Sequence, residues 1–191
     1  MAPKAKPAGP KAEATKAAIL EAARERFAAD GYERATIRTI AGDAGIDPAL
    51  VMRYFGNKEK LFAAAAKFDL RVPDLTRVPR RGLGAGLVGH FLDRWESDDT
   101  LKALLRAAVS NKVAAGRMRT IFETQLVAAI APLFQSRATA ATRAGLVTSQ
   151  MLGLALTRYL LRFPAVVALD RAAVVGWLGP TIQRYVTGEV G

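Results

Sequence analysis

Apolar residues recur at helical spacing along most of the chain. Between Glu13 and Asp30, the apolar residues Ile19, Ala23 and Phe27 return every four positions, which is the period of an amphipathic helix. Gly31 follows this run, and glycine ends helices readily because it adopts positive φ at little cost. The pattern therefore predicts a first helix over residues 13–30, stopped at Gly31.

Three short helices are predicted to follow between residues 36 and 68. Each begins at a residue whose side chain can accept hydrogen bonds from the free amides of a first helical turn, namely Thr36, Asp47 and Asn57. Pro48 suits the first position of its helix, because proline has no amide to leave unpaired there. A helix, a tight turn and a second short helix form the layout of a helix-turn-helix.

The turn between the second and third helices has the sequence Gly45-Ile46-Asp47-Pro48. Glycine permits the reversal of the chain, and the isoleucine can close the core beneath it. This register predicts that Ala49, Leu50 and Arg53 face outward on the third helix, where a recognition helix meets base edges in the major groove. Small apolar side chains suit thymine methyl groups, and Arg53 suits guanine or a phosphate.

Polar residues near two helix starts, together with one tyrosine, are candidates for phosphate contacts. Lys58 and Lys60 open the fourth helix, where the helix dipole disfavours a cation unless an anion docks on the free amides. Thr36 and Arg38 at the second helix, with the Tyr54 hydroxyl, could clamp the other side of the groove. The alternative is an ordinary solvated polar face.

Beyond residue 71 the composition changes and then becomes helical again. Residues 72–86 contain two prolines and three glycines, which break regular structure. We expect a basic arm over 1–12, a helix-turn-helix domain over 13–60 and a helical domain over 61–191. No strand alternation is found, so the fold class is predicted to be all-α. Helices are expected at Leu87–Trp95, Asp99–Val109, Val113–Phe134, Thr139–Phe163 and Asp170–Val186, with Pro132 ending or kinking the third and Pro180 kinking the last.

Composition excludes several classes of chemistry. The chain has no cysteine and only one histidine, His90, so thiol catalysis and sites built from paired histidines cannot be formed. The longest uncharged runs are 13 and 14 residues, shorter than the roughly 18 needed to span a bilayer. No signal peptide is evident at the N-terminus. We expect a cytoplasmic protein without cofactor, metal, membrane contact or enzymatic activity.

The charge favours a polyanionic partner. Lysine and arginine total 28 against 17 acidic residues, a formal net charge of +11, which suits nucleic acid or an anionic surface. Residues 1–70 hold 12 basic and 9 acidic residues, whereas residues 71–191 hold 16 and 8. Most of the excess therefore lies outside the predicted helix-turn-helix. The arm over 1–12 is either a solvated tail or an added source of phosphate attraction.

Two features near the start of the predicted C-terminal domain are not expected to carry a function. Residues 84–89 match G-x-G-x-x-G, but a dinucleotide site requires a preceding strand and an acid about 20 residues later. Neither is present, so a loosely wound helix start is the better interpretation. His90 has no neighbouring serine and carboxylate that sequence can connect to it, and a structural or surface role is expected.

The run Thr36–Phe62, preceded by Ala28-Ala-Asp-Gly-Tyr32, resembles the DNA-binding domain of the tetracycline-repressor (TetR) family of transcriptional regulators. The resemblance covers residues 13 to about 65. It implies a homodimeric repressor that binds a palindromic operator and is released by a small-molecule effector; an activator or a ligand-independent regulator remains the alternative. The family's DNA-contacting positions fall on Thr36, Arg38, Asp47, Pro48, Ala49, Leu50, Arg53, Tyr54 and Lys58. Met52 stands where many members have an aromatic residue, so operator preference does not transfer.

The resemblance also implies an effector pocket and a dimer interface in the C-terminal domain. Large adaptable side chains and glutamines within apolar runs suit such a pocket, although an ordinary core uses the same residues. The candidates are Phe91, Trp95, Met118, Phe122, Gln125, Gln150, Met151 and Tyr159. Small residues in the last two long helices allow close helix approach, either to a second copy or within the chain. They are Ala144, Gly145, Gly153, Ala155, Ala172, Ala173, Gly176 and Gly179.

Overall fold

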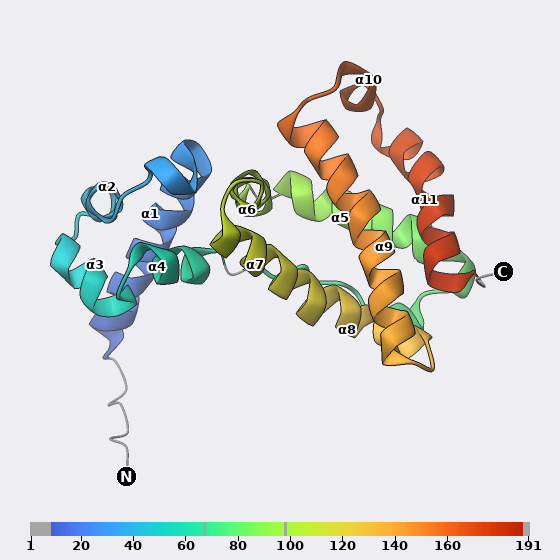
Figure 1. The fold of residues 1–191 in the computed structure, drawn as a ribbon, viewed down its shortest axis with the longest axis horizontal. Helices are drawn as coiled ribbons and strands as arrows, with labels where there is room; N and C mark the ends of the chain where they lie inside the picture. The colour runs from blue at the N-terminus through green and yellow to red at the C-terminus, as the bar shows by residue number, and fades with distance from the viewer. Residues whose placement is uncertain (1–8, 67, 98, 189–191) are drawn as a thin grey trace, which may run out of the picture. The chain divides into compact units, whose positions relative to one another are not determined.

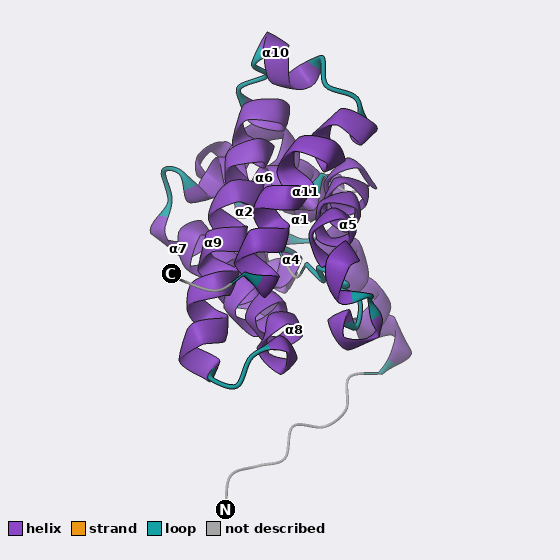
Figure 2. Cartoon of the chain, turned by 90° about the vertical axis from the view of Figure 1, so that its right-hand side faces the viewer, coloured by secondary structure: helices purple, strands orange, loops and turns teal. Residues whose placement is uncertain are grey.

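The structure is a computed structural model that describes residues 9–66, 68–97 and 99–188. Every regular element within these ranges is helical (Figures 1 and 2), which confirms the all-α class. The chain divides into two compact units, Met1–Lys67 and Phe68–Gly191. Among the described residues, no helix combines the length and the apolar character that crossing a membrane requires.

The N-terminal unit contains four helices. They are α1 (Pro10–Arg34), α2 (Ile37–Asp43), α3 (Pro48–Phe55) and α4 (Lys58–Ala65). Helix α1 begins at Pro10, so the last part of the arm expected over 1–12 is helical, and residues 1–8 lie outside the described residues. Gly31 has φ 77° and interrupts the helical backbone where the sequence predicted a stop.

Helix α4 belongs to the N-terminal unit, which therefore extends beyond the boundary expected at residue 60. Its side chains Leu61 and Phe62 are buried because α4 packs along α1. The Phe62 ring lies 4.9 Å from the Phe27 ring and 5.0 Å from the Tyr32 ring, between centroids. These edge-on contacts join the start of α4 to the second half of α1 and form the aromatic core of the unit.

The described part of the C-terminal unit is built mainly from five longer helices and the short helix α8. They are α5 (Leu83–Ser97), α6 (Thr100–Ala108), α7 (Lys112–Ile121), α8 (Val127–Ile130), α9 (Arg137–Ala155) and α11 (Arg171–Thr187). A π-helical turn, η3 (Phe122–Leu126), joins α7 to α8, and another, η5 (Leu156–Leu160), continues α9. Short 3₁₀ turns occupy Leu75–Arg77, Arg80–Gly82 and Ala131–Leu133.

Two prolines and one unusual residue modify the predicted helices. Pro132 lies in the 3₁₀ turn that follows α8, so the predicted helix over 113–134 ends early as expected. Pro180 lies inside α11, which continues to Thr187. The helix expected to reach Phe163 stops sooner, because Arg162 has φ 53° and leaves the helical region. A short helix that the sequence did not predict, α10 (Pro164–Val167), follows.

Helices α5 and α11 make the most extensive helix contact of the C-terminal unit. Gly84 lies at this contact: a Cβ atom placed on it would approach the Gln183 backbone nitrogen to 2.5 Å. On the opposite side, a Cβ atom on Gly179 would lie 3.4 Å from the Ala85 Cα atom. The apparent nucleotide motif at 84–89 is therefore part of an ordinary helix whose first glycine permits close packing.

Candidate DNA-binding surface and effector pocket

The turn between α2 and α3 is formed by local contacts, of which the sequence predicted the glycine reversal and the Asp47 cap. Gly45 has φ 64° and reverses the chain. The Ile46 amide donates to the Ala41 carbonyl at 2.9 Å, and the Ala49 amide donates to the Asp47 carboxylate at 2.7 Å. Val51 is fully buried beneath α3. The opposite side of α3 is exposed at Pro48, Ala49, Met52 and Arg53.

An ion pair joins α1 to the last residue of α2. Arg26 donates to both carboxylate oxygens of Asp43, at 2.7 and 2.6 Å, and to Asp30 at 3.1 Å. Hydrogen bonding to Arg26 is the main cause that lowers the pKa of Asp43. A two-point contact of this kind fixes orientation as well as distance. The pair therefore holds the first helix of the helix-turn-helix against α1.

Three of the predicted DNA-contacting residues form hydrogen bonds within the protein, and a fourth is partly buried. Thr36 caps α2 by accepting from the Thr39 amide at 3.1 Å, and Asp47 caps α3. Lys58 donates to the Glu33 carbonyl at 3.1 Å, and its Nζ lies 4.4 Å from the Tyr32 ring centroid. Tyr54 is partly buried. These side chains are held in place before any ligand arrives.

Arg38 and Arg53 are exposed, as Thr36 and Asp47 are, whereas Tyr54 and Lys58 are partly buried. Within residues 9–66 and the other described ranges, neither guanidinium forms an ion pair or a hydrogen bond with the protein. Arg53 lies 5.5 Å from the Tyr54 ring centroid, and Lys16 approaches the same ring at 5.6 Å. Lys16 was missed from the sequence because nothing in the local pattern of α1 connects it to α3. The remaining predicted positions, Pro48, Ala49 and Leu50, lie in the first turn of α3, where the first two are exposed and Leu50 is partly so.

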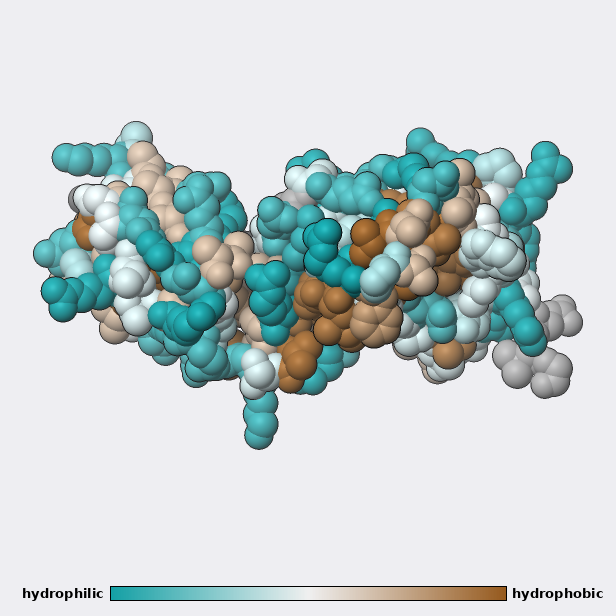
Figure 3. All heavy atoms as spheres, turned by 90° about the horizontal axis from the view of Figure 1, so that it is seen from above, coloured by the Kyte–Doolittle hydropathy of each residue, from teal (hydrophilic) through white to brown (hydrophobic). Residues whose placement is uncertain are grey.

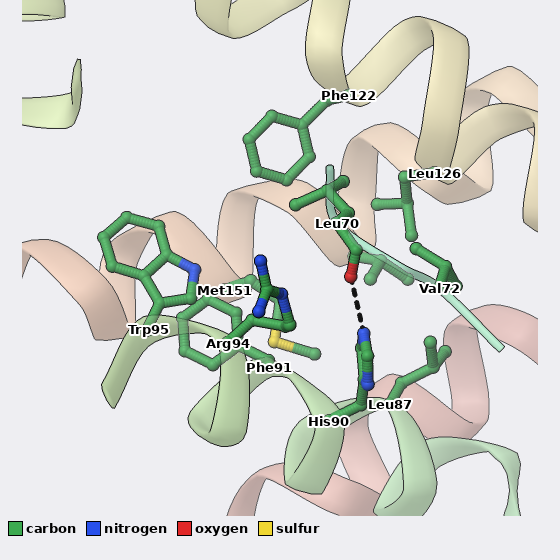
Figure 4. A pocket seen from close by; sticks show the side chains of 11 residues that line it. Leu70, Val72, Leu87, His90, Phe91, Arg94, Trp95, Phe122, Leu126 and Met151 are labelled. Atoms are coloured by element: carbon green, nitrogen blue, oxygen red, sulfur yellow. Dashed lines mark hydrogen bonds between the residues drawn. The ribbon is translucent and has the colours of Figure 1, made fainter. Parts of the chain in front are cut away.

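A largely apolar pocket lies in the C-terminal unit (Figure 4). It has about 420 Å³ of empty space, including its open side. Helix α5 supplies one wall, η3 and α9 supply others, and the segment that precedes the first 3₁₀ turn supplies the rest. The lining residues are Leu70, Val72, Leu87, His90, Phe91, Arg94, Trp95, Phe122, Leu126, Val147 and Met151.

Four of the predicted effector contacts line this pocket: Phe91, Trp95, Phe122 and Met151. The other four lie elsewhere. Met118 is buried outside the lining, and Gln150 is partly exposed on α9. Tyr159 stacks on Trp95 at 5.9 Å and donates to Glu96 at 3.1 Å. Burial is the main cause that raises the pKa of Tyr159 to about 12.

Gln125, the last of the predicted contacts, binds the backbone instead of lining the pocket. Its side-chain nitrogen donates to the Phe68 carbonyl at 2.8 Å, and its side-chain oxygen accepts from the Leu70 amide at 2.6 Å. His90 Nε2 lies 2.7 Å from the Leu70 carbonyl, to which it must donate. Figure 4 shows this bond at the pocket wall. The extended segment after α4 is thus fastened by side chains from α5 and η3.

Two of the pocket's polar residues were not among the sequence candidates. His90 was expected to be structural, and it does hold the Leu70 carbonyl, but it also lines the pocket. Arg94 was not singled out at all, although it lies between Phe91 and Trp95 on the same helix. The sequence feature that could have identified Arg94 is its position one turn after His90 on the same amphipathic helix.

The outward sides of α9 and α11 expose small and apolar residues. Trp177 is 80% exposed and Leu146 is 41% exposed, while Gly145, Gly153 and Gly176 have no neighbouring atom near the position of a Cβ. In contrast, Ala144, Ala155 and Gly179 are buried. Some small residues of these helices therefore pack within the chain, and others lie at the surface. We call the exposed side of α9 and α11, which carries Leu146, Trp177 and the three unobstructed glycines, the open face. Figure 3 shows apolar side chains gathered on the surface of the C-terminal unit.

Comparison with known proteins agrees with this architecture. Residues 19–65 match the family described as "Bacterial regulatory proteins, tetR family", and residues 82–186 match "Tetracyclin repressor-like, C-terminal domain". A TetR-family regulator of Streptomyces coelicolor is similar over 96% of this chain and 99% of its own, with 28% identity and a TM-score of 0.64. The secondary repressor NalD of Pseudomonas aeruginosa has the same fold, with 20% identity, a TM-score of 0.65 and coverage of 92% and 97%.

Curated relatives match mainly in the N-terminal unit. The HTH-type transcriptional repressor AcnR of Corynebacterium efficiens is 47% identical over 51 residues, which span 27% of this chain and 27% of that protein. The HTH-type transcriptional repressor SCO4008 of Streptomyces coelicolor is 48% identical over 52 residues, again 27% of each chain. Because the family match extends over most of both units, the chain belongs to the TetR family of bacterial transcriptional regulators.

Proposed function

We propose that the protein is a transcriptional repressor that binds a palindromic operator as a homodimer and releases it when a small molecule fills the pocket. The observation that carries DNA recognition is the pair of exposed arginines, Arg38 and Arg53, on either side of a turn that the protein already holds by caps. Arginines with no protein acceptor are available for phosphates and guanine edges.

Dimerisation follows from the geometry of recognition. Helix α3 is only 8 residues long, so one copy reads only a few base pairs, and two copies must be held about 34 Å apart or at a multiple of that distance. The open face of α9 and α11, with Trp177 at its surface, is the surface we assign to the second copy. Exposed apolar area of this kind is typical of a protein interface.

A binding experiment with matched variants tests the DNA surface. The probe is a duplex carrying an inverted repeat from the gene's own promoter, titrated by fluorescence anisotropy. We expect Arg38→Ala and Arg53→Ala each to weaken binding about tenfold or more, because a lost arginine contact costs about 1–3 kcal/mol. Arg119→Ala removes an equal charge from an exposed position on α7 and serves as the control.

The same titration decides against the proposal if all three variants bind as the unchanged protein does. A second series over several salt concentrations separates the two arginines. Loss of a phosphate contact weakens all sequences and lowers the salt slope, whereas loss of a base contact weakens the operator more than random DNA.

A further inference from the structure

Arg94 carries a buried donor that the protein leaves unused. Its Nε atom is buried and has no hydrogen-bond partner. The other two nitrogens are directed elsewhere: Nη2 donates to the Asp69 carbonyl at 3.0 Å, and Nη1 approaches the Ser97 hydroxyl at 3.5 Å. A buried donor without an acceptor is costly, and more so when it belongs to a charged group. An acceptor supplied from outside the chain would remove that cost.

Arg94 is also one of the residues that line the pocket. Arg94 lines the cavity beside Trp95 and Phe91, and Figure 4 shows its guanidinium among the apolar side chains. The Phe68 ring lies 4.7 Å from the guanidinium carbon and covers one side of it. Within residues 68–97 and the other described ranges, no carboxylate lies within ion-pair distance of Arg94. Among the described residues, the guanidinium charge therefore has no anionic partner.

The rest of the lining favours a ligand that is mostly apolar. Nine of the 11 lining residues are leucine, valine, phenylalanine, tryptophan or methionine. His90 adds no free donor at Nε2, because that nitrogen already donates to the Leu70 carbonyl. A phosphate group presents three or more oxygens and would find one unused donor here. A carboxylate needs fewer donors and matches the planar guanidinium.

We propose that the pocket binds a small amphipathic monocarboxylate, with its carboxylate on Arg94 Nε and its apolar body against Phe91, Phe122 and Met151. This proposal names the class of ligand for the effector response given under Proposed function. Ligand binding does not depend on that response, and only the effect of the ligand on DNA binding rests on it. Because Arg94 also donates to the Asp69 carbonyl through Nη2, an anion at Nε binds the same guanidinium that fastens the segment after α4. The bound ligand therefore contacts the residue that holds this segment.

Calorimetric titration of the full chain without DNA tests the ligand class. Octanoate and 4-phenylbutanoate are the acidic probes, and octan-1-ol and octylamine are the matched neutral and cationic probes. We expect the acids to bind about tenfold or more tightly than the alcohol, because a hydrogen bond to a charged group is stronger than one to a neutral group, and the amine to bind least. Equal binding of acid and alcohol to the unchanged protein overturns the proposal, and this comparison requires no variant.

Substitutions then locate the carboxylate. Arg94→Gln removes the charge, and Arg94→Lys keeps the charge but lacks the Nε donor. We expect both to lose most of the preference for acid over alcohol, whereas Arg119→Gln on exposed α7 keeps it. Circular dichroism verifies folding. In the unchanged protein, octanoate should shift the side-chain ¹⁵N–¹H resonance of Arg94 Nε, and an unmoved resonance during saturable binding contradicts the assignment.

A parallel DNA titration separates the two proposals. If octanoate binds at Arg94 but leaves operator affinity unchanged, the effector response fails while the chemistry of the pocket stands. If the protein binds no operator but still selects acids over alcohols, the DNA assignment alone fails.

Discussion

Gly84 shows how a single residue determines the distance between two helices. Its missing side chain lets α5 approach the backbone of α11 at Gly179 and Gln183. Gln183 also donates to the Arg80 carbonyl at 2.8 Å and accepts from the Gly84 amide at the same distance. The start of α5 is therefore capped by a residue far along the chain. From the sequence, Gly84 is only the first glycine of the apparent G-x-G-x-x-G motif, and its contact with α11 is not predicted.

Gly84→Ala should destabilise the C-terminal unit by about 2 kcal/mol or more, because backbone atoms must move to admit the methyl group. Gly86→Ala is the matched control, since a Cβ there meets nothing within 4 Å. Alanine is favoured over glycine inside a helix by about 0.5–1 kcal/mol, so the control should be slightly stabilised. Urea unfolding measures both, and equal midpoints would show that the helices do not meet as closely as described.

Between elements, the Arg26–Asp43 pair links α1 to α2. The hydrogen bonds from Arg26 lower the pKa of Asp43 below its ordinary value. The pair therefore stabilises the N-terminal unit above the pKa of an unfolded aspartate, about 3.9, and this stabilisation is lost as the pH falls through the lower folded value. Acid should loosen the helix-turn-helix at the contact of α1 with α2.

Asp43→Asn should lower the stability of the unit at pH 7 and flatten its dependence on pH between about 2 and 5. Thermal melts across this range, followed by circular dichroism, make the comparison. Glu25→Gln, at an exposed position of α1, is the control and should keep the slope of the unchanged protein. An equally steep acid transition in Asp43→Asn would rule out this pair as its cause.

The caps of the N-terminal helices were predictable, whereas the contacts between helices were not. Thr36, Asp47 and Asn57 act through amides within three residues of themselves, so the local sequence contains both partners. Arg26 and Asp43 lie 17 positions apart, and nothing in the periodicity of either helix selects that pairing. The same reason explains why Lys16 beside Tyr54 was missed.

For the whole molecule, the open face of α9 and α11 determines the oligomeric state in our proposal. Trp177 is the most exposed large apolar residue described there. An exposed tryptophan among glycines can enter a close interface between symmetry-related helices. In that proposal, two recognition helices bind one duplex only through this interface, so its loss should weaken both assembly and DNA binding.

Trp177→Glu should shift the protein toward monomer, because a carboxylate would be buried without a partner. Sedimentation equilibrium gives the dimer dissociation constant, which we expect to rise by about tenfold or more, as for other interface tryptophans. Phe163→Ser removes an exposed aromatic outside α9 and α11 and should leave that constant unchanged. A Trp177→Glu protein that remains dimeric would place the interface elsewhere.

The sequence by itself determined the helical class, the helix-turn-helix and its caps, because these depend on periodicity and on contacts between near neighbours. It also identified four of the residues that line the pocket. Only the tertiary structure showed that Gln125 holds the backbone, that His90 and Arg94 reach the same cavity, and that Ala144 and Gly179 pack inward while Trp177 does not. Each of these depends on which helices lie together, and apolar periodicity gives the buried side of a helix without naming its partner.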